Sequence, residues 1–120
     1  MFAYKNLDPN WIKKVVCKDG VTLDKLRPEI LKALEVAVYV YATFGQKLVV
    51  TSANDGKHMK NSLHYKDLAF DLRTRDIEPK IVEEMVAVIK KNLTADYDVI
   101  IETISPHLHI EFDVKGVKTT

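Results

Sequence analysis

The stretch DGKHMKNSLHYKDLAFDLRTRD, residues 55–76, decides the fold because it gathers histidines and aspartates around one short apolar strand. Within it, AFDLRT (residues 69–74) alternates apolar and polar side chains, as a strand with one buried face does. We expect Phe70 and Leu72 to face a core and Asp71 to face the other side. Asp is a poor strand former, and a carboxylate amid apolar residues costs stability unless it faces water or a cation. Asp71 is therefore a candidate binding residue.

A second strand with the same alternation lies near the end of the chain, in HLHIEFDV (residues 107–114). Its apolar side chains share one face and its polar side chains share the other: Leu108, Ile110 and Phe112 against His107, His109 and Glu111. If the two strands lie close in one sheet, Asp71 and His109 converge on its polar face. His64, in the turn ahead of the first strand, can then reach the same point.

The remaining elements follow from periodicity and from turn residues. RPEILKALEVAVYVYATFG (27–45) has Pro28 in a first turn, apolar residues at helical spacing and Gly45 as a stop. A second helix is expected from Asp76 to about Asn92, and further strands at residues 46–52 and 97–103, with a turn near Ser105 and Pro106. This order predicts a single α+β domain over residues 1–120, with a mainly antiparallel sheet and helices packed on one face.

Composition excludes several classes of protein. With 120 residues, 47% of them hydrophobic, the chain suits one compact core, and we expect a monomer. A net charge of +1 without a basic block does not favour nucleic acid as a partner. Cys17 is the one cysteine, so a metal would need histidine and carboxylate ligands. We see no signal-peptide pattern and no apolar run long enough for a bilayer, which predicts synthesis in a cytoplasm and no membrane partner.

The set His64, Asp71 and His109 suits a catalytic zinc ion. Two neutral imidazoles and one carboxylate can hold Zn²⁺ and leave a fourth position open for water. Because the last ligand comes from a distant strand, the fold itself must assemble such a site.

The motifs resemble those of a known family. SLHYKDLAFDL (62–72) resembles the Ser-x-His-x-x-Gly-x-Ala-x-Asp motif of the zinc peptidases that cut bacterial cell-wall peptides, the D-alanyl-D-alanine carboxypeptidase and L-alanyl-D-glutamate peptidase family. PHLHIEF (106–112) resembles its closing His-x-His strand, and the signalling domain of Hedgehog proteins carries the same pair of motifs. The resemblance implies a Hedgehog-type peptidase fold and a Zn²⁺ cofactor.

The resemblance also implies roles for single residues. It makes His64, Asp71 and His109 the zinc ligands, and His107 the residue that stabilises charge on the substrate oxygen. Glu102 is the candidate general base. Glu111 is the alternative because it shares a strand face with His109, and no family pattern supports it. Residues that border the site or contact substrate are His58, Ser62 and Arg73.

Two positions depart from the family pattern. Asp67 stands where the motif has Gly, and Asp is one of the few residues that tolerate the positive φ that such a Gly often adopts. The loop TSANDGKH (51–58) lacks the Arg with which many members bind a substrate carboxylate, and Arg73 is a candidate replacement. An endopeptidase cut is therefore as compatible with the sequence as carboxypeptidase action.

Three functions are compatible with these features. The first is a phage or prophage endolysin-type zinc peptidase that acts on peptidoglycan stem peptides of the host cell wall after release from the cell. The second is a non-catalytic zinc-binding domain that keeps the ligands. The third is a phage virion component that uses the same fold for attachment or penetration.

Overall fold

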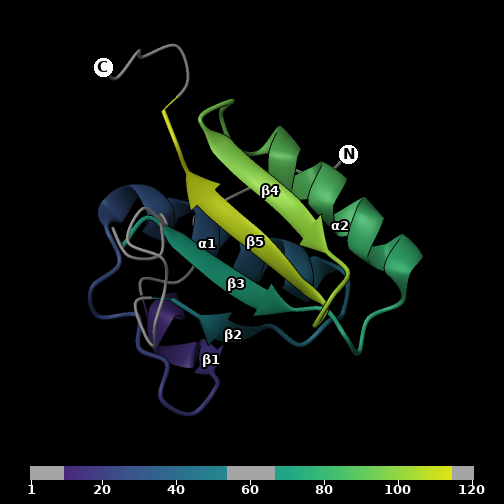
Figure 1. Ribbon diagram of the computed structural model, residues 1–120, viewed down its shortest axis with the longest axis horizontal. Helices are drawn as coiled ribbons and strands as arrows, with labels where there is room; N and C mark the ends of the chain where they lie inside the picture. The colour runs from purple at the N-terminus through teal and green to yellow at the C-terminus, as the bar shows by residue number, and fades with distance from the viewer. Residues whose placement is uncertain (1–9, 54–66, 115–120) are drawn as a thin grey trace.

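A computed structural model describes residues 10–53 and 67–114 of the chain. They form an α+β fold with one mixed five-stranded sheet and two helices. The strand order is β1 (Val16–Cys17), β2 (Val49–Ser52), β3 (Ala69–Arg73), β5 (His107–Phe112) and β4 (Tyr97–Glu102) (Figure 1). β1 pairs with β2 in parallel, and the other neighbouring strands are antiparallel. The prediction of an α+β fold with a mainly antiparallel sheet is confirmed.

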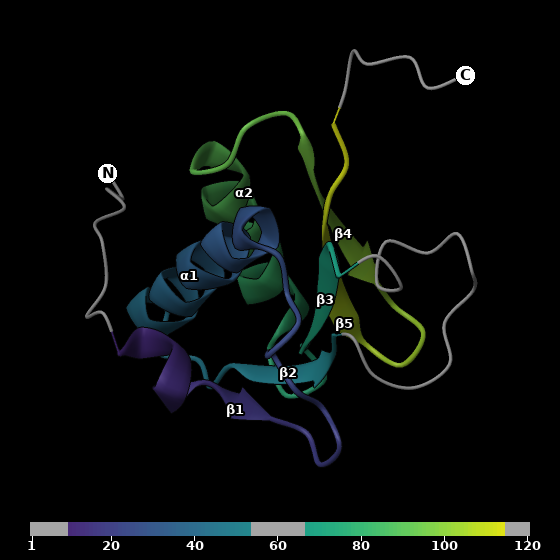
Figure 2. The same ribbon diagram turned by 90° about the vertical axis from the view of Figure 1, so that its left-hand side faces the viewer.

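Both helices lie on the same side of the sheet (Figure 2). α1 (Pro28–Thr43) starts with Pro at its first position, where the missing N–H is not needed, and ends just before Gly45, whose φ is +68°. α2 (Pro79–Lys91) also starts at a Pro, and Lys90 and Lys91 in its last turn complement the negative end of the helix dipole. Neither described helix combines the length and apolar character needed to cross a membrane.

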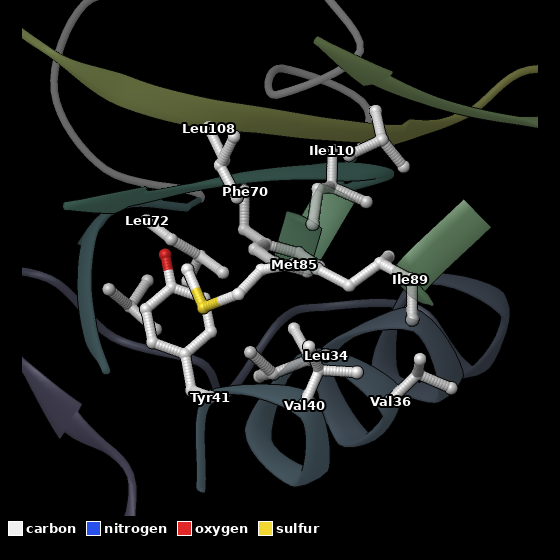
Figure 3. Close-up of a cluster of buried hydrophobic side chains, with 14 of the residues drawn as sticks. Leu34, Val36, Val40, Tyr41, Phe70, Leu72, Met85, Ile89, Leu108 and Ile110 are labelled. Carbon is white, nitrogen blue, oxygen red and sulfur yellow. The ribbon is translucent and has the colours of Figure 1, made fainter. Parts of the chain in front are cut away.

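The core fills the space between the helices and the sheet (Figure 3). Its largest side chains come from α1, α2, β3 and β5, and those fully buried include Leu34, Tyr41, Phe70, Leu72, Met85, Ile89, Leu108 and Ile110. Phe70 and Leu72 face the helices, as the alternation predicts, and so do Leu108 and Ile110. The opposite side of the sheet is therefore left to the polar residues of β3 and β5.

Two details of the secondary structure differ from the sequence-based prediction. The second helix begins at Pro79 and not at Asp76, because residues 74–77 form a turn in which the Ile77 N–H donates to the Thr74 carbonyl. A short 3₁₀ helix, Trp11–Lys14, and the edge strand β1 were not predicted. β1 contains two residues, which is too short for a period-two pattern to be recognised.

Candidate metal and catalytic site

Asp71 and His109 meet on the side of the sheet that faces away from the helices. They are direct cross-strand partners in the pairing of β3 with β5. The Nδ1 atom of His109 lies 2.9 Å from Oδ1 of Asp71. Since partners in an antiparallel pair project to the same face, the register alone brings the two side chains together. The predicted convergence of Asp71 and His109 is therefore present in the structure.

The second nitrogen of the His109 ring has a carboxylate partner as well. Nε2 lies 2.6 Å from Oε1 of Glu111, which stands two residues along the same strand face. The side chains of Asp71, His109 and Glu111 are 17%, 19% and 18% exposed, so water screens these contacts only partly. His109 is held between two carboxylates, one at each edge of its ring.

This arrangement favours a positive charge at His109. Burial lowers the pKa of His109, but the hydrogen bonds and negative charges of Asp71 and Glu111 outweigh burial, so its pKa lies above the usual value. A pair of carboxylates that converges on one imidazole is an environment suited to a cation, either a proton on the ring or a metal ion at its nitrogen.

His107 lies next to this pair. Its Nδ1 atom is 2.8 Å from the carbonyl oxygen of Ser105, and because a carbonyl can only accept, Nδ1 carries the proton. Its Nε2 atom is 3.8 Å from Oδ2 of Asp71. The ring is therefore anchored by the turn that precedes β5, where Ser105 has a φ of 49°. One nitrogen of His107 points into the site.

Glu102, the candidate general base, is at the end of β4 opposite His107. It is exposed, and in the described part of the chain its carboxylate makes no hydrogen bond or ion pair with Asp71, His107 or His109. Ile100, and not Glu102, is the β4 partner of His109. Glu111, the alternative base, is instead engaged with the His109 ring.

Two of the three predicted ligands can be located. Asp71 supplies an oxygen and His109 a nitrogen, which are donors that zinc accepts, and they are close enough to share one ion after a small adjustment. His64, the third predicted ligand, lies outside the described residues, as do His58 and Ser62. The donors that are described fit a zinc ion in their chemistry.

Asp67, which replaces the motif Gly, has a φ of 64°. This is the left-handed conformation that Gly adopts readily and that Asp tolerates better than most residues. Its carbonyl oxygen accepts a hydrogen bond from the N–H of Arg27, just before α1, at 3.1 Å. The positive φ that favours Gly at this position of the motif is thus present at Asp67 in this chain.

A cavity of about 560 Å³ adjoins Asp71 and His107. Its wall includes three cationic side chains, from Lys18, Arg73 and Arg75. Arg73 is half-buried, and across residues 10–53 and 67–114 neither its guanidinium nor the ammonium of Lys18 has a hydrogen-bond or ion-pair partner. The cavity therefore presents positive charge beside the candidate metal site.

Sequence reasoning missed three features of this surface. Lys18 directly follows β1, which was not predicted, so no motif or periodic pattern in the neighbouring sequence indicated that Lys18 lines the cavity. The pairing of His109 with Glu111 could have been found from their two-residue spacing on one strand face. The oxygens of Asp98, Glu111 and Asp113 also lie within 4.8 Å of one another, and the closeness of Asp98 depends on the β4–β5 register.

No protein-family model matches the chain, and a search of curated proteins gave no significant match.

Proposed function

We propose that this protein is a zinc-dependent peptidase that hydrolyses peptide bonds in bacterial peptidoglycan stem peptides. The observation that carries the proposal is the contact of Asp71 with His109 at 2.9 Å, on the polar face of the sheet and beside His107. These are the residues to which the resemblance assigns the metal and the transition state. His64 completes the proposed ligand set.

Two further observations support the resemblance on which the proposal rests. Asp67 has the positive φ expected of the motif Gly. Ala69 and Asp71 both occupy β3, so the end of the first motif is on the strand that pairs with the His-x-His strand. Two motifs separated in the sequence thus contribute neighbouring strands.

Zinc bound at this site would supply Lewis-acid polarisation of the scissile carbonyl and lower the pKa of a bound water toward about 7. The protein's own residues supply the rest. His107, with Nδ1 donating to Ser105, is oriented toward the site through Nε2, and its imidazolium form would donate from Nε2 to the substrate oxygen as negative charge develops there. Asp71 and Glu111 orient His109 from opposite sides of its ring.

The proton-transfer step needs a carboxylate base. We retain Glu102 for this role in the proposal, because it is exposed at the strand end next to His107 and has no ion pair within the described residues that would hold it elsewhere. In this mechanism it takes the proton of the attacking water and passes it to the leaving amine.

The proposed substrate is an anionic peptide. Arg73 and Lys18, which have no ion-pair partner among residues 10–53 and 67–114, offer positive charge on the wall of the cavity that adjoins Asp71 and His107. Stem peptides carry carboxylates both at their ends and on their D-glutamate residues, so either group can occupy this wall. A carboxypeptidase would use the terminal carboxylate, and an endopeptidase that cuts after L-Ala would use the D-glutamate.

The direct test is digestion of purified sacculi by the Zn²⁺-loaded protein, followed by mass spectrometry of the released material. Loss of terminal Ala would identify a carboxypeptidase, and new amino termini on Glu would identify a cut between L-Ala and D-Glu. Asp71→Ala and His109→Ala should abolish release, whereas Asp76→Asn, on an exposed carboxylate outside the site, should not. Absence of any product from the unaltered protein on sacculi and isolated stem peptides would refute the peptidase proposal.

One observation favours a second candidate, a zinc-binding domain without catalytic activity. Among the described residues, Glu102 makes no hydrogen bond or ion pair with Asp71, His107 or His109, and Glu111 is engaged with the His109 ring. Replacing Glu102 with Gln discriminates between the two functions. A peptidase should lose hydrolysis and keep its zinc, whereas a binding domain shows zinc binding and no hydrolysis in either form.

A further inference from the structure

We infer that Glu111 is a positioning residue, whose carboxylate fixes the ring of His109 so that Nδ1 faces Asp71 and any cation bound there. The inference rests on the proposed metal site and adds to it a residue to which the resemblance gives no such role. Its basis is the 2.6 Å contact between Oε1 of Glu111 and Nε2 of His109, set against the 2.9 Å contact between Nδ1 and Asp71.

The backbone makes this contact possible. His109 and Glu111 are two residues apart in β5 and therefore project from the same face of the sheet. Glu111 is opposite Ala69 in β3, while His109 is opposite Asp71. The side chain of Ala69 is a single methyl group, so it leaves space for its cross-strand partner. The longer side chain of Glu111 can therefore cover Ala69, which is fully buried, and turn back along the strand toward the imidazole.

The chemistry of the ring then sets the direction of the hydrogen bond. A neutral imidazole has one N–H donor and one nitrogen with a free lone pair. An ionised carboxylate can only accept, so Glu111 favours a proton on Nε2 and Asp71 favours one on Nδ1 in the metal-free protein. A metal ion bound beside Asp71 would replace the Nδ1 proton, and Glu111 would then keep the remaining proton on Nε2. Histidines that ligate metals commonly donate their other N–H to a carboxylate, which orients the ring and increases its basicity.

This role differs from that of a general base. The Oε1 atom of Glu111 is occupied by the ring nitrogen on the side of His109 away from Asp71. A base must instead reach the water on the open side of the metal. Glu111 therefore acts through His109 and does not touch substrate.

The nearby carboxylates offer a competing explanation that the experiment must exclude. Asp98 and Asp113 come within 4.8 Å of Glu111, so the three could in principle hold a cation themselves. In that case Glu111 would be a ligand, and Asp98 and Asp113 would matter as much as Glu111.

The test measures Zn²⁺ and Co²⁺ affinity of the full chain by calorimetry for five proteins: wild type, Glu111→Ala, Glu111→Gln, Asp98→Asn and Asp113→Asn. Glu111→Ala should bind about 10- to 100-fold more weakly, the usual loss when the partner of a ligating histidine is removed. Glu111→Gln should recover most of the affinity, because its amide oxygen still accepts from Nε2. Asp113→Asn removes the same charge from the same cluster and keeps the carboxylates of Asp71 and Glu111 at the His109 ring, so it should bind like wild type.

Two readouts separate positioning from a general effect on folding. The absorption bands of bound Co²⁺ should change in Glu111→Ala and return in Glu111→Gln, because they depend on how the histidine presents its nitrogen. Thermal unfolding of the metal-free variants shows whether each one is folded at the temperature of the titration. If Glu111→Ala is not folded, the comparison of Glu111→Gln with Asp113→Asn decides: the inference predicts near-equal affinities, and a large loss in Glu111→Gln contradicts it.

Three results would overturn the inference: unchanged affinity in Glu111→Ala, a failure of Glu111→Gln to recover, or a loss in Asp98→Asn and Asp113→Asn as large as that in Glu111→Ala. If the wild type binds no metal, the proposed function fails, and the inference is judged separately. Nitrogen-15 NMR of the metal-free protein then reports whether Nε2 of His109 carries a hydrogen-bonded proton, which should be present in wild type and lost in Glu111→Ala. An Nε2 without a proton in wild type would contradict the role of Glu111.

Discussion

At the scale of single residues, Asp71 is the residue whose position most constrains function. It is flanked in β3 by the fully buried Phe70 and Leu72, and its own side chain is 17% exposed. A carboxylate with so little access to water needs a polar or charged partner, and His109 provides it. The same desolvation that makes an unpaired Asp71 costly makes its attraction for a cation strong.

Asp67 provides a test of the backbone at the start of the motif. Asp67→Gly should leave stability unchanged or raise it by up to about 1 kcal/mol, since Gly adopts positive φ without strain. It also removes the Oδ1 atom, which is buried and has no hydrogen-bond partner in the described part of the chain. Asp67→Ala should be less stable than Asp67→Gly by roughly 1–2 kcal/mol. Urea unfolding measures both, and greater stability in the Ala variant would contradict the conformational argument.

His109 should make the stability of the metal-free protein depend on pH. Its folded-state pKa lies above the usual value of 6.5, so the stabilisation it contributes is complete below about pH 6.5 and is lost as pH rises through the folded pKa. In EDTA, the difference in unfolding free energy between wild type and His109→Gln should therefore be larger at about pH 6 than at about pH 9. If the difference in unfolding free energy between wild type and His109→Gln increases toward high pH, the raised pKa of His109 is contradicted.

Arg73 should contribute to substrate binding. If its guanidinium binds a substrate carboxylate, Arg73→Ala removes a charge-assisted hydrogen bond of about 1.5–3 kcal/mol and should raise KM about 10- to 100-fold, with a smaller effect on kcat. Arg75→Ala is the matched control, because Arg75 lines the same cavity but is exposed and 3.9 Å from Asp76. An equal effect of both substitutions would indicate a general electrostatic attraction and no specific contact.

At the scale of elements, the alternation of β3 and β5 divides each strand between core and site. The residues that pack against α1 and α2 hold the sheet in place, and their neighbours in sequence form the polar face. A shift of the β3–β5 register by one residue would exchange these faces and place Leu108 or Ile110 opposite Asp71. The hydrophobic core therefore enforces the contact between Asp71 and His109.

Tyr41 connects α1 to the strand that carries the site. Its hydroxyl donates to the carbonyl oxygen of Arg73 at 3.3 Å, and burial raises its pKa, which keeps the hydroxyl protonated as a donor. Tyr41→Phe should lower the free energy of unfolding by about 1 kcal/mol, because the bond is lost in a buried environment. The control is Thr43→Ala, which removes an exposed hydroxyl that bonds within α1 and should change stability less. If chemical denaturation shows equal losses of unfolding free energy in Tyr41→Phe and Thr43→Ala, the hydrogen bond from Tyr41 to β3 does not stabilise the protein more than a bond within α1 does.

At the scale of the whole molecule, the site depends on the complete sheet. Asp71 comes from β3, His107 and His109 from β5, and Lys18 from the segment after β1. No two consecutive elements contain all of these groups. Metal binding should therefore be coupled to folding of the entire chain, because the unfolded chain does not hold the ligands together.

Saturating Zn²⁺ should stabilise the protein, by about 2.7 kcal/mol at a free concentration 100-fold above Kd. The measurement is a thermal melt with and without Zn²⁺, with EDTA reversal. Asp71→Ala should abolish the increase in Tm, while Asp113→Asn should preserve it, although Asp113 belongs to the acidic cluster with Asp98 and Glu111. Loss of the Zn²⁺ effect in Asp113→Asn alone would place the ion in that cluster and contradict the proposed ligands.

Part of this molecule could be predicted from the sequence. Three features follow from local patterns and are present in the structure: the face that each side chain takes in β3 and β5, the two helices, of which the first has Pro28 in its opening turn, and the positive φ at Asp67. These properties depend on backbone geometry over a few residues, which the sequence records directly. The start of the second helix was predicted three residues too early.

The tertiary structure alone decided which residues meet. No local pattern determined the strand order or the pairing of Asp71 with His109. The same is true of the contact between Glu111 and the His109 imidazole and of the cavity lined by Lys18 and Arg73. Pairing between strands that are distant in the chain depends on how the whole core packs, and β1 was too short to be recognised beforehand. Alternation established that a histidine and an aspartate face the same side, and the packing of the helices against the sheet established that they touch.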